Sequence, residues 1–157
     1  MVSPTAISYF YVKLLNMTKC VFCNIIDGIV PASIVYEDKT CIAFMDIRPF
    51  NKGHLLVVPK THATYLADLD PEIGGYLFKV TQKLSRAVRK SGVKCEGINL
   101  FLADGEAAGQ EVFHLHIHIL PRYKGDTFGL KFGKEYEKIP QRLDLDKIAD
   151  NVKSKIE

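Results

Sequence analysis

The sequence predicts an α+β fold in which an antiparallel sheet of about five strands carries one long helix on one face, with a further helix near the C-terminal end. Short segments of alternating apolar and polar residues, typical of half-buried strands, are separated by turn residues. One longer segment instead repeats its apolar residues at intervals of three and four, the period of an amphipathic helix. Because the strands are not each followed by a helix, the pattern favours an antiparallel sheet covered by a helix.

The composition is that of an ordinary globular protein. Of its 157 residues, 47% are hydrophobic and 25% are charged, which suffices for one domain with a buried core. The net charge of +3 comes without a long run of Lys and Arg, so a nucleic-acid groove is not indicated. No apolar run approaches the length of a membrane span, and the four cysteines follow no convincing secretory signal. We expect a cytoplasmic protein that has no nucleic-acid or membrane partner.

Three strands are expected in the first part of the chain. Residues 33–37 and 40–46 are joined by the turn Asp38-Lys39, and the second strand alternates apolar and small or polar residues. Residues 54–58 form the third strand, which ends at a proline.

The long helix is predicted between Asp70 and Gly92. Asp70 is a good N-cap, Pro71 suits the first helical position, and a glycine commonly follows a helix end. Its buried stripe is expected to contain Ile73, Leu77, Val80, Leu84 and Val88. A fourth strand at residues 97–103 and a final amphipathic helix at residues 145–156 complete the predicted elements.

A fifth strand at residues 112–121 contains three regularly spaced histidines. Alternation places His114, His116 and His118 on one face, with neighbours about 6.6–7 Å apart, so all three cannot bind one metal ion. An edge strand can expose polar residues without using histidine, whereas imidazole can act as nucleophile, acid, base or ligand near neutral pH. The preceding loop, residues 104–110, has two glycines whose backbone N–H groups could face an anion, which suggests a phosphate site.

The segment Gly-Gln-Glu-Val-Phe-His-Leu-His-Ile-His-Ile-Leu-Pro-Arg, residues 109–122, resembles the signature of the histidine triad family of nucleotide hydrolases and transferases. The resemblance is to the zinc-containing bacterial and archaeal type, and it extends upstream in consistent order. Its further stretches are residues 20–26, 43–49 and 52–62. It implies a triad domain at residues 17–125, an N-terminal extension at 1–16, and a C-terminal extension with a helix at 126–157 that belongs to the same globular unit.

The two-residue spacing of Cys20 and Cys23 suits thiolates that share a tetrahedral metal ion, although a redox pair has the same spacing. Redox pairs of this kind usually follow a parallel strand, and none is predicted here. The family resemblance adds His62 and His114 as the other two ligands of a structural Zn²⁺ ion.

The resemblance also implies a purine nucleotide site. Asp46 would accept hydrogen bonds from the ribose, and His116 would attack the α-phosphorus with one ring nitrogen while the other donates to a fixed acceptor such as a backbone carbonyl. His118 would hydrogen-bond a phosphate oxygen, and His54 would act from behind it. The base would be held by Phe22, Ile26, Phe44 and Ile47, and the phosphate by Gly109 and Gln110.

The function implied is cleavage at the α-phosphate of an adenosine-type conjugate, a dinucleoside polyphosphate or a nucleoside phosphoramidate, through a covalent nucleotidyl-histidine. Family members often pair through the long helix and the strand before the triad, so a homodimer is expected. Two alternatives stay open: a hydrolase with a catalytic zinc on a His-x-His pair, and a zinc-stabilised nucleotide-binding or interaction protein without turnover.

Two positions depart from the family pattern. Ala103 stands where many members have Asn or Gln, and Glu111 where Ser or Thr is common. A carboxylate at residue 111 would repel a polyphosphate if it pointed inward, so these positions bear on substrate preference.

Overall fold

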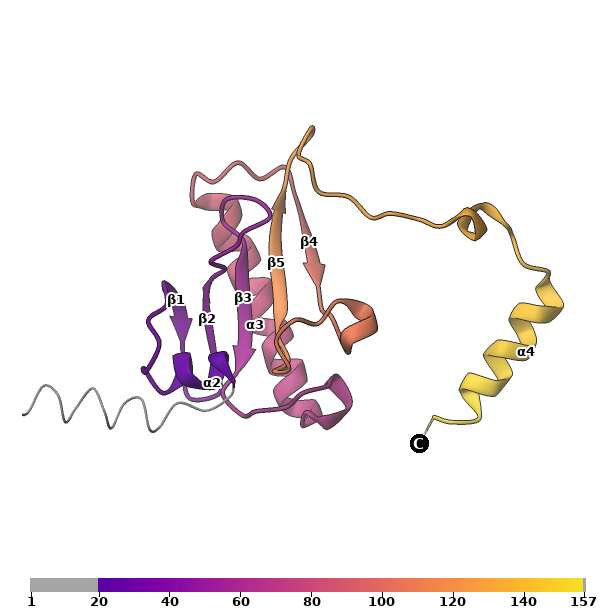
Figure 1. Cartoon of the computed structure of the whole chain (residues 1–157), viewed down its shortest axis with the longest axis horizontal. Helices are drawn as coiled ribbons and strands as arrows, with labels where there is room; N and C mark the ends of the chain where they lie inside the picture. The colour runs from indigo at the N-terminus through magenta and orange to yellow at the C-terminus, as the bar shows by residue number, and fades with distance from the viewer. Residues whose placement is uncertain (1–19, 157) are drawn as a thin grey trace, which may run out of the picture. The chain divides into compact units, whose positions relative to one another are not determined.

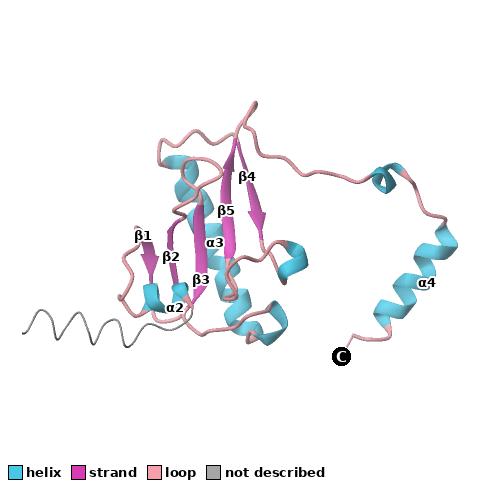
Figure 2. Cartoon of the chain, in the orientation of Figure 1, coloured by secondary structure: helices cyan, strands magenta, loops and turns pink. Residues whose placement is uncertain are grey.

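The computed structural model describes residues 20–156, which form two compact units, residues 20–126 and 127–156, treated separately below. The predicted N-terminal extension, residues 1–16, lies outside the described residues. The first unit confirms the predicted fold class: one antiparallel five-stranded sheet in the order β1-β2-β3-β5-β4 (Figures 1 and 2). Its strands are β1 (Ile34–Glu37), β2 (Cys41–Met45), β3 (Leu55–Pro59), β4 (Gly97–Phe101) and β5 (Ile117–Arg122).

The long helix α3 (Pro71–Lys90) lies against one face of the sheet, where it contacts β3 and β5 (Figure 1). The Asp70 carboxylate accepts from the amides of Glu72 (2.8 Å) and Ile73 (3.4 Å), which caps the first turn. The buried side of α3 consists of Leu77, Val80, Thr81, Leu84 and Val88. The predicted stripe thus packs on the sheet, and only Ile73 at its start is less than fully buried.

Alternation in β2 and β3 divides the apolar core into two layers. The α3 side contains Cys41, Ala43, Leu55 and Val57, while the other side contains Ile42, Phe44, Leu56 and Val58 packed around Phe22. Leu56 pairs in register with His118, so the His118 side chain belongs to the face opposite α3. That second face is where the histidines, the cysteines and the first described helix come together.

A short helix that the sequence did not predict, α2 (Val21–Ile26), covers part of this second face. Phe22 and Asn24 are its buried residues. Cys20 is its N-cap and accepts from the Cys23 amide at 3.5 Å. One turn of helix therefore places the two thiols on the same side.

The predicted histidine strand is wrong at its beginning. Ladder pairing starts only at Ile117, because the backbone turns at His114, whose N–H donates to Val112 O at 2.8 Å. The Leu115 N–H donates to Ala63 O at 2.7 Å instead of to a neighbouring strand. Of the triad, only His118 therefore lies in the paired strand, whereas His114 and His116 precede it and both meet the ring of Phe22 edge-on, at 5.9 and 5.1 Å.

The second unit contains a short 3-10 helix, Lys134–Glu137, and α4 (Arg142–Lys153), which starts and ends slightly earlier than the predicted residues 145–156. That residues 126–157 complete the globular unit of the triad domain stays a prediction. Within residues 20–156, no helix is both long and apolar enough to span a membrane.

Candidate active site and metal centre

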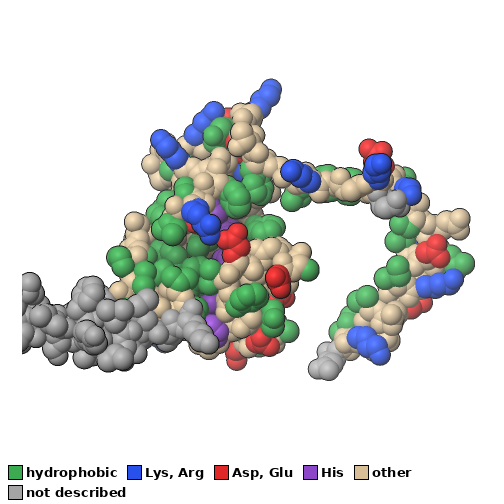
Figure 3. All heavy atoms as spheres, in the orientation of Figure 1, with side chains coloured by type: hydrophobic (Ala, Val, Ile, Leu, Met, Phe, Trp, Pro, Cys, Tyr) green, Lys and Arg blue, Asp and Glu red, His purple; other side chains and the backbone are tan. Residues whose placement is uncertain are grey.

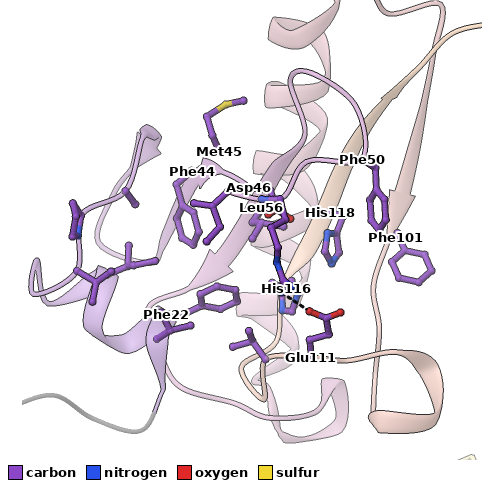
Figure 4. Close-up of a pocket in the computed structure, with 18 of the residues that line it drawn as sticks. Phe22, Phe44, Met45, Asp46, Phe50, Leu56, Phe101, Glu111, His116 and His118 are labelled. Atoms are coloured by element: carbon purple, nitrogen blue, oxygen red, sulfur yellow. Dashed lines mark hydrogen bonds and ion pairs between the residues drawn. The ribbon is translucent and has the colours of Figure 1, made fainter. Parts of the chain in front are cut away.

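A cavity of about 500 Å³ opens on the face of the sheet opposite α3, between α2, the loop after β2 and the loop before β5 (Figures 3 and 4). Among the predicted nucleotide-site residues, those that line it are Phe22, Phe44, Asp46, Ile47, Gly109, His116 and His118. Ile26 packs instead against the apolar cluster below, and its neighbour Ile25 contributes to the lining. Ile47 stands at the rim and is 92% exposed.

One end of the cavity is aromatic and apolar. The ring of Phe22 meets Phe44 edge-on at 5.5 Å and His116 edge-on at 5.1 Å, and both phenylalanines are buried. Val21, Ile25, Val30 and Leu56 extend this wall. A flat apolar group can therefore be buried here within reach of the His116 ring.

Hydrogen bonds fix the proton on His116. Its Nδ1 lies 2.7 Å from the carbonyl oxygen of His114, and because a carbonyl can only accept, Nδ1 carries the hydrogen. Burial lowers the pKa of His116, so the ring is neutral near pH 7. The remaining nitrogen, Nε2, is left with a free lone pair on a ring that lines the cavity.

A second chain of bonds fixes His54 and His118. The Phe50 amide donates to His54 Nδ1 at 3.4 Å, which assigns the His54 hydrogen to Nε2, and Nε2 lies 2.8 Å from His118 Nδ1. His118 Nδ1 then accepts, so its own hydrogen is on Nε2. Burial, together with the nearby His116 and His54, lowers the pKa of His118 to about 4. Both rings are thus neutral, but the second nitrogen of each differs: Nε2 of His118 can donate a hydrogen bond, whereas Nε2 of His116 can accept one.

Asp46 links the rim of the cavity to this pair. Its Oδ1 accepts from the Arg48 amide at 2.8 Å, and its Oδ2 lies 3.5 Å from His54 Nδ1. Asp46 raises the pKa of the buried His54, but burial outweighs it and the net shift is downward. One face of the carboxylate lines the cavity, where it can accept from a ligand hydroxyl.

The loop before β5 is held by Gln110. The Gln110 carboxamide is buried; its oxygen accepts from the Gly105 amide and its nitrogen donates to Thr64 O, both at 2.8 Å. Gly105 and Gly109 have φ of +99° and +85°, a conformation that favours glycine. The Gln110 side chain therefore braces the loop, and Gly109 is the part of it that lines the cavity.

The four predicted metal ligands meet beside the cavity. His114 Nδ1 lies 3.3 Å from Cys20 Sγ and 3.6 Å from Cys23 Sγ, and His62 Nδ1 lies 3.3 Å from Cys23 Sγ. The four ligand atoms are all within 4.8 Å of one another, and neither thiol is in a disulfide.

The protonation of His114 suits a metal ligand. Its Nε2 donates to Pro59 O at 2.9 Å, so Nδ1, which faces the sulfurs, has the lone pair. Two thiolates and two imidazoles at these separations fit a tetrahedral zinc ion with no open position.

Arg48, Phe50 and Phe101 are residues of the site that escaped the sequence prediction. Arg48 lines the cavity and forms an ion pair of 2.8 Å with Glu111, which also lines it and which the sequence marked as a departure from the family pattern, and Phe50 stacks on His54 at 5.4 Å. Phe101 meets His118 edge-on at 5.7 Å. Arg48 and Phe50 fall within or beside stretches that carry the family resemblance, which was the available signal, but nothing in the sequence indicated their partners.

The chain belongs to the HIT domain family, whose pattern matches residues 28–125. Members of this histidine triad family are generally nucleotide-binding hydrolases and transferases, which is the class that the fold and the histidine site define.

Among similar sequences, an uncharacterised HIT-like protein of Methanocaldococcus jannaschii is 42% identical over 135 residues, 85% of this chain and 98% of its own. The adenylylsulfatase HINT3 of Arabidopsis thaliana is 38% identical over 107 residues, 68% of this chain and 54% of its own.

Many solved structures are also similar, and two of them bear on the fold and the metal site. A HIT family member from Bacillus subtilis has a TM-score of 0.81 at 38% identity and covers 89% of this chain and 99% of its own. A zinc-bound histidine triad family protein from Mycobacterium smegmatis has a TM-score of 0.68 at 44% identity and covers 76% of this chain and 86% of its own.

Proposed function

We propose that the protein cleaves at the α-phosphorus of adenosine-type nucleotide conjugates, either dinucleoside polyphosphates or nucleoside phosphoramidates, through a covalent nucleotidyl-histidine at His116. The observation that carries the proposal is the 2.7 Å bond from His116 Nδ1 to a backbone carbonyl. It leaves a neutral imidazole whose second nitrogen can attack phosphorus without first losing a proton.

In this proposal the base lies against Phe22, Phe44 and Ile47, with Ile26 behind them, and Asp46 accepts from the ribose hydroxyls. The aromatic end of the cavity supports this placement, since a purine gains most from flat apolar contacts. The relative named an adenylylsulfatase supports an adenylyl group as the part that is recognised.

The reaction proceeds in two displacements. His116 Nε2 forms a P–N bond as the bond from phosphorus to the leaving group breaks. Water then forms a P–O bond as the P–N bond breaks; the water gives up a proton to solvent, the nucleotide departs, and His116 returns to its neutral form. The His118 Nε2–H donates to a phosphate oxygen, and the amides near Gly109, whose loop Gln110 braces, face the developing charge. His54 positions His118 through the 2.8 Å bond between their rings.

A Zn²⁺ ion at Cys20, Cys23, His62 and His114 is part of the proposal as a structural ion. It would tie α2 to the turn that contains His114, and no step of the reaction passes through it. The zinc-bound relative from Mycobacterium smegmatis supports the choice of metal.

We further propose a cytoplasmic homodimer that pairs through α3 and β4. Apolar side chains exposed on these elements support it: Phe78 is 59% exposed and Leu100 43%.

The test is to trap the intermediate with an adenosine conjugate labelled at the α-phosphorus. Rapid quenching and peptide mass spectrometry should find the nucleotidyl group on His116. A catalytic-zinc hydrolase and a binding protein without turnover would both form no such adduct, so label on no residue, or on a residue other than His116, would overturn the mechanism.

A further inference from the structure

The ion pair between Arg48 and Glu111 lies at the mouth of the cavity. Arg48 Nη2 is 2.8 Å from Glu111 Oε2, and the side chains are 80% and 76% exposed. The two residues are 63 positions apart, one in the loop after β2 and the other directly after the glycine loop. Both line the cavity together with His116 and His118, and in Figure 4 the dashed line of the ion pair ends at the Glu111 carboxylate.

The charges around this mouth are few. Among the described residues that line the cavity, Asp46 and Glu111 are acidic and Arg48 is the one cation. The lining therefore carries a formal charge of −1 (one positive and two negative side chains), and its cation is already bound to a carboxylate.

An exposed ion pair of this kind is held weakly, so it can exchange partners with a ligand. A phosphate offers Arg48 a bidentate partner of equal or greater charge, but taking it leaves the Glu111 carboxylate free beside the same phosphate chain. Each phosphate beyond the α-phosphate adds negative charge next to Glu111 and competes with it for a single guanidinium. A neutral or cationic leaving group is not repelled by Glu111 and does not compete with it for Arg48.

We propose that the Arg48–Glu111 pair is a specificity determinant that discriminates against polyphosphate extensions of the nucleotide. This inference rests on the proposed function and deepens it, because it selects the class of leaving group: conjugates of a nucleoside monophosphate with a neutral or cationic group are favoured over polyphosphates. Glu111 is the selecting residue, and Arg48 is the group it holds.

The experiment is calorimetric titration with adenosine, AMP, ADP and ATP of the wild type, Glu111→Gln, Arg48→Met and the double variant. In the wild type, affinity should not rise from AMP to ATP. In Glu111→Gln the ATP to AMP affinity ratio should rise by roughly three- to tenfold, since one nearby charge at a wet surface is worth about that much, and the gain should shrink at high salt. Adenosine affinity should not change, and Arg48→Met should abolish most of the gain in the double variant.

Glu37→Gln is a matched control. Glu37 also forms an exposed ion pair, 2.7 Å from Lys60 Nζ, but it does not line the cavity, so the ATP to AMP ratio should stay at the wild-type value. Because Arg48 and Glu111 are both largely exposed, the variants should fold, which thermal unfolding will show. An unchanged ratio in Glu111→Gln, or a wild type that already prefers ATP, overturns this inference alone. Absence of adenosine and AMP binding in every variant overturns the proposed function as well.

Discussion

His116 offers the sharpest test of the proposed chemistry. Replacing it with Asn keeps a side-chain N–H that can donate to the carbonyl of His114 but removes the nitrogen that would attack phosphorus. Turnover should fall by at least about 10⁴-fold, as expected when a nucleophile is lost. Nucleotide affinity should stay within about tenfold, or roughly 1.4 kcal/mol, because the main work of this nitrogen is done in the transition state.

The structure also sets the stability cost. His116 is 5% exposed, packs against Phe22 and makes one hydrogen bond to the backbone. His116→Ala removes a bond worth about 1 kcal/mol and leaves a cavity, so a loss on the order of 2–4 kcal/mol is expected. His116→Asn should lose less, which makes it the better variant for kinetics.

The assay combines steady-state turnover of an adenosine conjugate, nucleotide titration and thermal unfolding on the same preparations. Phe113→Ala serves as the control, because Phe113 is close in sequence and 47% exposed, and no role in the reaction is proposed for it. If His116→Asn bound nucleotide normally and still turned over at more than a few per cent of the wild-type rate, the nucleophile would have to be another residue.

Three further predictions concern the neighbouring groups. His118→Ala should lower kcat by about 10²–10³, the usual cost of one preorganised donor to an oxyanion, and steady-state kinetics showing no loss would remove it from the mechanism. Cys20→Ser should lower zinc content and thermal stability together, whereas Cys95→Ser should change neither; full metal content in a variant lacking both Cys20 and Cys23 thiols would refute the site. Stability should fall as the pH is lowered from about 6.5 towards 4, because unfolded histidine binds protons in this range while folded His118, with a pKa of about 4, does not. Urea unfolding across this range checks the sign: wild-type stability should be flat just above pH 7, and in His118→Gln the acid slope should be shallower.

The sequence could predict α3 and most of the sheet because burial there follows the intrinsic period of each element. The buried residues of α3 recur every three or four positions, and β2 and β3 alternate between two apolar layers. The helix α2 could not be predicted in this way. It has six residues, too few for a period, and its N-cap is a cysteine, which is not a usual capping residue.

Alternation failed at residues 112–116 because it reports which way side chains point and not where backbone hydrogen bonds go. Leu115 and His114 point in opposite directions as a strand requires, but their amides donate to Ala63 and Val112 instead of to the sheet. For a similar reason, the sequence predicted which residues belong to the site but not all the contacts between them. Spacing and resemblance named the imidazoles, whereas the Arg48–Glu111 pair depends on two loops meeting across 63 residues.

One bonded nitrogen on each of the triad rings accounts for the different roles that we propose for them. His114 and His116 each donate to a backbone carbonyl, of Pro59 and His114 respectively, through opposite nitrogens. The lone pair of His114, on Nδ1, therefore faces the cysteines, whereas the lone pair of His116, on Nε2, is left free on a ring that lines the cavity. His118 differs, since its partner is the side chain of His54 and not a carbonyl. The partners of His114 and His116 are backbone carbonyls, which substitution of a neighbouring side chain cannot remove. The partner of His118 is a side chain, so the position of the His118 proton depends on the identity of residue 54. The position of that proton is therefore the part of the site most open to change by mutation.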